Sequence, residues 1–582
     1  MKNTTCSFLC VFTLFLCSTL NAYAENIVAN KSNQSSPSIS SQSYAIQPLT
    51  VIRFMTKFQP VDGVAPFGNY WVDYGSMKNI INGDLSKNLG LAYSLIIGEK
   101  TKFTKSLPVG YEPQKLLEWG KYPGLNMDIL HKHGFTGKGA VVAYIVLPIK
   151  EHEQFTRDNV HYIPPVPDYK VSTMHGATVL SLLTGKDIGT APEAEVYYYS
   201  TADGEDSFMW VAKNLNAIIE KNKTLEDNKK IRMVGLSINI DYSNPYADMA
   251  NKAVKGCEEA GIMVWFCGEY GAFSFIPYSD RNSFNSLVSD SWLNYSIPEL
   301  VSIPTTGRTT ATTAPDDYKY IYWSKGGLSW AMPYVLGLYA IALEINPSLT
   351  QNDLRKMIVD TAYINFDQIP IINPVGFVAA VLKSVGRNAE AQVILDEAKA
   401  RIKYLYAVMN TTVMTEKDLT AVGDYLACIT DARVLTVDAA KYTDEQSLCS
   451  AIQQDAKQRG GCVAGIQVFG NNEMVFELKN NPLISNWSIA RLSIGKGEFE
   501  SFLNKFKAYS LGLDQEHTGI KNFAVVEPNI AAMSLCDSKG YINQSPEQLK
   551  KLYKLVRKNH PHYDHRNKIT TDGNPLGDEK TI

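Results

Sequence analysis

The sequence predicts an α/β fold in which helices cover a mostly parallel sheet, followed by a second α/β unit nearer the C-terminus. Between residues 123 and 386, short runs rich in β-branched and aromatic residues alternate with longer runs whose apolar residues recur every three or four positions. This alternation is typical of parallel sheets covered by helices. The expected strands are residues 140–145, 195–199, 231–237 and 261–266, and the expected helices are 175–183, 207–221, 246–260 and 329–345.

The second unit is expected within residues 387–551. It opens with a strongly helical stretch, 387–410, and strand, helix and strand patterns follow at 432–437, 444–459 and 462–469. A basic, histidine-containing tail, 552–582, closes the chain.

The first 24 residues have the pattern of an export signal. Lys2 precedes an apolar run at 8–20, and Ala-Tyr-Ala at 22–24 is a small-x-small cleavage site. The apolar run is too short for a good membrane span, and no later run reaches 18 consecutive apolar residues. We therefore expect a secreted or periplasmic protein without a membrane span.

Two segments separate the signal from the central unit. Residues 25–44 are rich in Ser, Asn and Gln and are expected to form a disordered leader. Residues 45–122 mix short apolar runs with Gly and Pro, and are expected to be a propeptide-like extension or an accessory layer packed on the next domain.

Composition narrows the range of partners. Without the signal, which contains Lys2 as its only charged residue, 55 basic side chains (56 minus 1) face 59 acidic ones, so the basic excess of a nucleic-acid-binding domain is missing. The six cysteines outside the signal include no CxxC pair and predict neither a zinc site nor a particular disulfide. The histidines at 560, 562 and 565 lie in a polar tail and are expected to be solvated. We expect no metal and no cofactor.

Two residues have the setting of a serine hydrolase. Ser329 follows Gly327 and opens a predicted helix, where free backbone amides favour an anion. His175 opens another predicted helix and is followed by Gly176. Taken alone, a serine at a helix start is usually a cap, and such a histidine is usually structural or solvated. The surrounding sequence makes the catalytic interpretation worth testing.

That surrounding sequence resembles the subtilisin-like serine peptidases (subtilases). Four segments match patterns of the family in the family's order. Residues 134–143 match the entry to the first core strand, and His175-Gly176 together with 189–195 matches the His-Gly…Gly-x-Ala-Pro segment. Residues 327–337 match the Gly-x-Ser-x-Ala-x-Pro block, and residues 347–362 match the segment that follows this block. The resemblance implies the three-layer subtilisin fold, with His175 as the base, Ser329 as the nucleophile and a polypeptide substrate or protein partner.

Two positions depart from the family pattern. The first core strand ends on Val146 where the family has the aspartate that orients the histidine, and loss of that carboxylate typically lowers kcat by roughly 10⁴-fold. Glu151, Glu153 and Asp158 follow the strand; they are either substitutes for this carboxylate or solvated loop charges. Glu269 stands where the family has the asparagine of the oxyanion hole, whose removal costs roughly 10²–10³-fold. Only a protonated Glu269 would donate a hydrogen bond there.

The substrate-binding wall is also altered. The family's Ser-Leu-Gly-Gly is Ser-Ile-Asn-Ile at 237–240. Leu328 replaces the family's Thr beside the serine, and Trp330 is expected to add bulk next to it. Two functions stay open. The favoured one is an exported homologue that binds polypeptide with impaired or no hydrolysis. The alternative is an active serine endopeptidase with a rearranged site, active at acidic pH.

Overall fold

A computed structural model describes residues 80–409, 433–469 and 488–492. The first range is interrupted at 87, 109–110, 156–157, 168–172, 203–206, 239–244, 285–286, 290–299, 314–317, 325 and 365–369. The expected signal, leader and tail lie outside these residues, as do Cys428 and Cys536. The predicted domain boundaries remain predictions.

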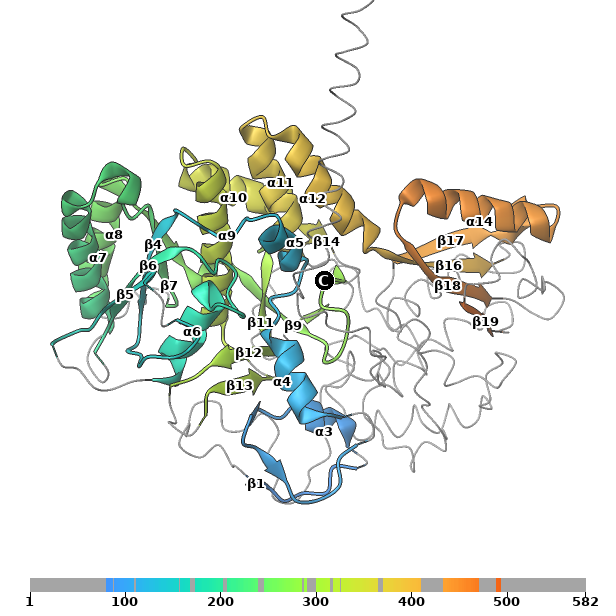
Figure 1. The fold of residues 1–582 in the computed structure, drawn as a ribbon, viewed down its shortest axis with the longest axis horizontal. Coiled ribbons are helices and arrows are strands. Elements are labelled where there is room, and N and C mark those ends of the chain that lie inside the picture. The colour runs from blue at the N-terminus through green and yellow to red at the C-terminus, as the bar shows by residue number, and fades with distance from the viewer. Residues whose placement is uncertain are drawn as a thin grey trace, which may run out of the picture. The chain divides into compact units, whose positions relative to one another are not determined.

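A five-stranded parallel sheet forms the centre of the fold, with strand order β5-β6-β4-β7-β8 (Figure 1). Every neighbouring pair is parallel, and Val146 at the end of β4 lies opposite Ser200 at the end of β6. The predicted strands are confirmed within two residues at each end, and β5 was not anticipated. The bounds are β4 Val141–Val146, β5 Val160–Ile163, β6 Glu195–Ser200, β7 Met233–Leu236 and β8 Met263–Phe266.

Helices cover both faces of this sheet, which confirms the three-layer α/β class. The side chains of β4 alternate: Val142, Tyr144 and Val146 join one apolar cluster with α6 and α9, whereas Val141 and Ile145 join another with α7 and α8. Figure 1 shows α7 and α8 together on one side of the sheet and α9 on the other. The bounds are α6 Met174–Thr184, α7 Ser207–Thr224, α8 Ala247–Glu259 and α9 Ala331–Ile345.

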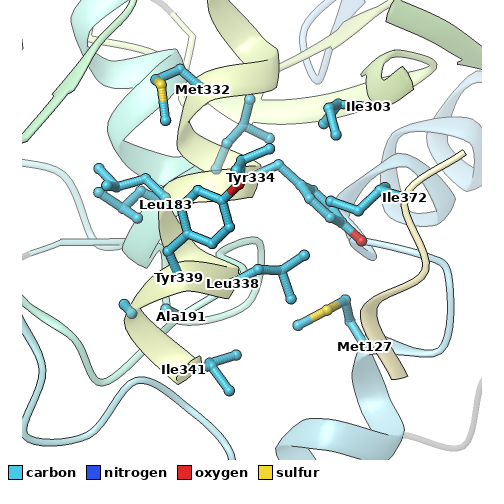
Figure 2. Packing of buried hydrophobic residues seen from close by; sticks show 14 of the residues in the cluster. Met127, Leu183, Ala191, Ile303, Met332, Tyr334, Leu338, Tyr339, Ile341 and Ile372 are labelled. Atoms are coloured by element: carbon cyan, nitrogen blue, oxygen red, sulfur yellow. The ribbon is translucent and has the colours of Figure 1, made fainter. Parts of the chain in front are cut away.

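The central helix α9 is almost entirely buried. All its residues except Glu344 are buried, and Figure 2 shows Met332 and Tyr339 of this helix among side chains from several elements, including Leu183 of α6. Within the described part of the chain, the stretch Leu328–Ile345 is long and apolar enough to cross a membrane by length and composition, but 78% of it is buried inside the fold. This is the burial of a core helix.

Two smaller sheets adjoin the central layers. One has the mixed order β10-β9-β11-β15-β14, and the other has the antiparallel order β12-β13-β2. Because β2 comes from the expected N-terminal extension and pairs with β13, part of that extension is built into the central domain. The bounds are β2 Ile97–Gly98, β9 Gly271–Phe275, β10 Leu287–Ser289, β11 Ser302–Thr306, β12 Arg308–Ala311, β13 Tyr320–Trp323, β14 Tyr363–Ile364 and β15 Pro370–Ile371.

The remaining helices of residues 80–400 come from the N-terminal extension and from the segments around the central layers. The extension contributes α3 and α4, together with the small parallel pair of β1 and β3, and α5, α10, α11 and α12 complete the rest. Thr350 caps α10, and the Asp353 carboxylate accepts from the Thr350 backbone in return. The bounds are β1 Ile80–Ile81, α3 Leu89–Tyr93, β3 Lys102–Phe103, α4 Pro113–Lys121, α5 Met127–Lys132, α10 Gln351–Asp360, α11 Pro374–Ser384 and α12 Asn388–Ala400.

A second α/β unit follows, as predicted, with a parallel sheet of order β17-β16-β18-β19 and the helix α14. The expected helix at 387–410 is wrong in its second half: α12 ends at Ala400 and the central strand β16 begins at Lys403. The reason is local, because Tyr404, Tyr406 and Val408 alternate along this stretch and are buried together against α14. The bounds are β16 Lys403–Met409, β17 Arg433–Asp438, α14 Glu445–Arg459, β18 Cys462–Phe469 and β19 Ser488–Leu492.

Candidate active site

Ser329 lies in a 3₁₀ turn, η5 (Leu328–Trp330), immediately before α9. Its hydroxyl donates to the backbone oxygen of Ser237, 3.0 Å away, and the Ser237 hydroxyl donates to the Ser329 oxygen at 2.7 Å. The Tyr144 hydroxyl lies 2.5 Å from the Ser237 hydroxyl. Ser329 is therefore held by a reciprocal pair of hydrogen bonds to the strand end after β7, with a buried tyrosine behind it.

His175 is the second residue of α6, whose first turn is capped by the Thr173 hydroxyl accepting from the Gly176 amide. Gly176 fixes how closely this helix approaches β4, because a Cβ there would lie 2.3 Å from the Leu147 oxygen and 2.7 Å from the Tyr198 hydroxyl. The start of α6 thus presses directly on the residue that follows Val146. A larger residue after the histidine would push the helix away.

His175 as a whole is partly exposed, but the Nδ1 side of its ring is buried without an orienting partner among the described residues. Its Nδ1 atom is buried and has no hydrogen-bond partner among the residues that the structure describes. Burial lowers the pKa of His175 from 6.5 to about 4, since desolvation disfavours the charged ring. The ring is therefore neutral at pH 7 and a weak base.

Val146 ends β4 on the face of the sheet that carries α6 and α9, and it is 5% exposed. A valine side chain accepts no hydrogen bond, so it cannot fix the tautomer of His175. Of the loop acids considered as substitutes, Glu153 accepts hydrogen bonds from the Tyr320 hydroxyl and the Lys319 ammonium. Glu151 and Asp158 are exposed. No hydrogen bond joins these three acids to His175 in the described part of the chain, so the substitution hypothesis has no support.

Glu269 is held away from a donor role. It ends the 3₁₀ turn η3 (Cys267–Glu269), where one carboxylate oxygen accepts from the Phe266 amide at 3.1 Å. The other oxygen accepts two hydrogen bonds from Arg355 of α10, at 2.8 and 3.1 Å. Both oxygens act as acceptors, which requires no proton on the carboxyl group. The protonated donor considered from the sequence is therefore not the state that this geometry favours.

The structure brings the predicted residues into one region. The turns η3 and η5 adjoin each other, and α6 adjoins η5. Among the described residues, however, no hydrogen bond joins Ser329 to His175. The arrangement has a nucleophile-type hydroxyl and a neutral imidazole, with Val146 at the end of β4 and Glu269, paired with Arg355, at the end of η3.

Three partners were missed by the sequence reasoning: Tyr144, the Ser237 hydroxyl and Arg355. Tyr144 was detectable, because strand alternation places it on the same face as Val146. Trp330 requires a correction, since its ring packs at 5.1 Å from that of Trp323 and is 1% exposed, so its bulk fills the core rather than the space beside the serine.

The described residues form no metal-ligand cluster, and one cavity among them lies apart from the predicted site residues. Within the described ranges, no three His, Cys, Asp or Glu side chains cluster as metal ligands. Of the described cysteines, Cys257 is a buried free thiol and Cys462 an exposed one. A cavity of about 360 Å³ is lined in part by Asn282, Phe284, Tyr363, Asp396 and Arg401, and none of the four predicted site residues lines it.

Comparison with known proteins gives relatives of one kind. No family model matches the sequence. Subtilisin BL of Lederbergia lenta is 24% identical over 246 residues, which are 40% of this chain and 86% of that protein. M-protease of Shouchella clausii is 24% identical over 246 residues, 40% of this chain and 61% of that protein, so the chain spans about three fifths of the latter's length.

Solved structures give a fold likeness of low score. The prenylagaramide maturation protease PagA aligns with a TM-score of 0.32 and 14% identity, over 44% of this chain and 98% of that one. A structure of the subtilase cytotoxin SubAB aligns with a TM-score of 0.36 and 11% identity, over 46% of this chain and 98% of that one. The sequence similarity to subtilisins confirms the family resemblance that the motifs predicted.

Proposed function

We propose that this chain, whose central part resembles subtilisin-like peptidases, is an exported homologue that binds polypeptide and hydrolyses peptide bonds poorly or not at all. The export follows from the signal pattern in residues 1–24. The polypeptide ligand follows from the family resemblance.

The observation that carries the proposal is the environment of His175. A serine hydrolase needs a base whose tautomer and orientation are fixed by a third group. The Nδ1 atom of His175 has no such partner among the described residues, and Val146 stands at the sequence position of the family's carboxylate. Loss of that one group typically lowers kcat by roughly 10⁴-fold.

Two further contacts support weak hydrolysis. The Ser329 hydroxyl donates to a backbone carbonyl rather than to an imidazole, so its proton is not directed toward a base. Glu269, which stands at the sequence position of the family's oxyanion asparagine, is paired with Arg355 and supplies no hydrogen-bond donor in this arrangement. Since catalytic groups act as a unit, these losses need not multiply.

One observation favours the alternative of an acid-active endopeptidase. With a pKa of about 4, His175 stays deprotonated at pH values where an ordinary histidine is charged, so it keeps the proton-accepting form in mildly acidic medium.

Labelling with a fluorophosphonate probe tests both candidates. The probe reacts with a serine hydroxyl that is activated by a base. The proposal expects no stoichiometric labelling of folded protein between pH 4 and pH 8, with a subtilisin as the positive control and Ser329→Ala as the background. Stoichiometric labelling that is fastest near pH 4–5 and is absent in Ser329→Ala would establish the acid-active enzyme instead.

A double substitution tests the assignment of the two altered positions. Val146→Asp with Glu269→Asn restores an orienting carboxylate and an uncharged donor, and should raise the labelling rate by at least 100-fold, the lower end of the effects of these groups. The matched control is Glu153→Asn with Val141→Asp, which places the same residue types on the loop and on the other face of β4. Equal rates in the double variant and in the wild type would show that positions 146 and 269 do not face the reacting hydroxyl.

A further inference from the structure

Two arginines are buried in the described core. Arg308, at the start of β12, has no exposed surface, and Arg281, in the segment after β9, is 3% exposed. Arginine is seldom fully buried unless an acid pairs with it, because an isolated buried charge loses its hydration.

Neither guanidinium pairs with a carboxylate of the described residues. Arg281 donates from Nη1 to the Gly307 oxygen at 2.7 Å, and its guanidinium lies over the rings of Phe275 and Trp119 at 3.8 and 4.3 Å. Arg308 donates from Nη2 to the Ile188 oxygen at 3.3 Å. A carbonyl and an aromatic face are partial partners, and neither carries the full negative charge that would neutralise a guanidinium.

The unsatisfied donors of the two arginines belong to one environment. Nε and Nη2 of Arg281 and Nε and Nη1 of Arg308 are buried without a hydrogen-bond partner, and so is the Tyr334 hydroxyl. The Tyr334 ring lies 5.9 Å from the Arg308 guanidinium, and its hydroxyl interacts electrostatically with both arginines. Burial lowers the pKa of Arg308 to about 10. Burial also lowers the pKa of Arg281, and repulsion by the Arg308 charge lowers it further. At pH 7 Arg308 therefore stays charged.

We propose that Arg281, Arg308 and the Tyr334 hydroxyl bind one small monovalent anion of halide size inside the central domain. Guanidinium groups are donors only, so the ligand must accept hydrogen bonds, and the two like charges require that it be negative. The close packing of the surrounding core restricts it to an ion of few atoms. A water molecule would accept the hydrogen bonds but leave the repulsion between the arginines uncompensated.

The position of the site gives the ion a structural role near Ser329. Tyr334 lies five residues after Ser329, in the first turns of α9, and Arg308 reaches from β12 to the backbone that follows α6. A bound anion would therefore tie α9 to β12 and to the segment after β9, and would stabilise the elements that position Ser329. This inference is independent of whether the protein hydrolyses peptides.

Anion-dependent thermal unfolding of the whole secreted chain tests the proposal. Sodium bromide or chloride would replace sodium gluconate at constant ionic strength while Tm is recorded. A halide bound only by the folded state should raise Tm in proportion to the logarithm of its concentration above Kd, by roughly 5 °C or more at 100 times Kd. Arg308→Met should abolish the dependence, whereas Arg355→Met, which removes an exposed arginine, should keep it. The same Tm in halide and in gluconate for the wild type would overturn the proposal.

A crystallographic experiment covers the case in which Arg308→Met does not fold. Wild-type crystals grown in sodium bromide should give an anomalous bromine peak within hydrogen-bond distance of both guanidiniums. A water molecule or a carboxylate of the chain itself at that point would refute the anion site.

Discussion

The approach of α6 to the end of β4 makes Gly176→Ala a sensitive test of the site geometry. The new Cβ would lie 2.3 Å from the Leu147 oxygen, 2.7 Å from the Tyr198 hydroxyl and 2.8 Å from the Ile149 Cγ2 atom. The first contact is with backbone, and the Leu147 oxygen is itself held by a 2.6 Å hydrogen bond from Tyr198. No rotamer change can relieve it.

Two opposing effects set the magnitude of this substitution. Alanine in a helix is favoured over glycine by up to about 1 kcal/mol, and overpacking of a core typically costs about 1–3 kcal/mol. With three contacts below 3 Å, the upper end applies, so Gly176→Ala should lower the free energy of unfolding by about 1–2 kcal/mol. Urea unfolding followed by fluorescence would measure it.

A matched glycine in another helix supplies the control. Gly256 of α8 has only the flexible end of Ile219 within reach of a new Cβ, at 3.3 Å. Gly256→Ala should therefore stabilise the protein by about 0.5–1 kcal/mol. If Gly176→Ala is as stable as Gly256→Ala, then α6 does not press on β4, and Val146 cannot be placed beside the imidazole.

The buried imidazole should make stability depend on pH. Because the folded-state pKa of His175 is about 4 and the unfolded value is 6.5, the unfolded chain takes up this proton first, so the free energy of unfolding should fall as pH drops from 6.5 toward 4. The difference in the free energy of unfolding between the wild type and His175→Gln should change by at most about 3 kcal/mol over that pH interval. A difference that stays constant with pH would exclude a buried neutral ring. Ser237→Ala should cost about 1–3 kcal/mol by leaving the buried Tyr144 hydroxyl unpaired, whereas Tyr144→Phe should cost no more than about 1 kcal/mol; the reverse order in urea unfolding would refute the contact. Glu269→Gln should change stability by less than about 1 kcal/mol, since its pair with Arg355 is half-exposed, and a larger loss would indicate a buried role.

Local sequence patterns predicted most elements of the central domain correctly. They predicted one element wrongly, at the start of the second unit. The core strands have a periodicity of two and the core helices one of 3.6, and these periodicities differ clearly. The observed ends of these elements differ from the predicted ends by only a few residues. The failure at 387–410 has a physical cause: only Arg401 and Ile402 separate α12 from β16, with no Gly or Pro to mark the change. The alternation of Tyr404, Tyr406 and Val408 was the available signal.

The site was predictable in its residues and not in their partners. The motifs located His175 and Ser329, because residues within one turn or strand end are fixed by local sequence. Arg355 lies 86 residues from Glu269, and Ser237 lies 92 residues from Ser329. Such pairs depend on how the layers stack, which no local pattern specifies, so the ion pair of Glu269 and the reciprocal bonding of Ser329 emerged only from the fold.

Ser329 and His175 differ in what the fold gains from them. The Ser329 hydroxyl makes a hydrogen bond that a purely structural serine would also make, so its presence is no evidence for chemistry. The His175 imidazole instead leaves Nδ1 buried and unpaired among the described residues, which costs about 1–3 kcal/mol relative to a satisfied group. A side chain that reduces stability is the one expected to serve another purpose, since strain and unpaired groups collect at functional sites. The choice between a binding protein and an acid-active peptidase therefore depends on what His175 contacts when a polypeptide is bound, more than on the presence of the serine.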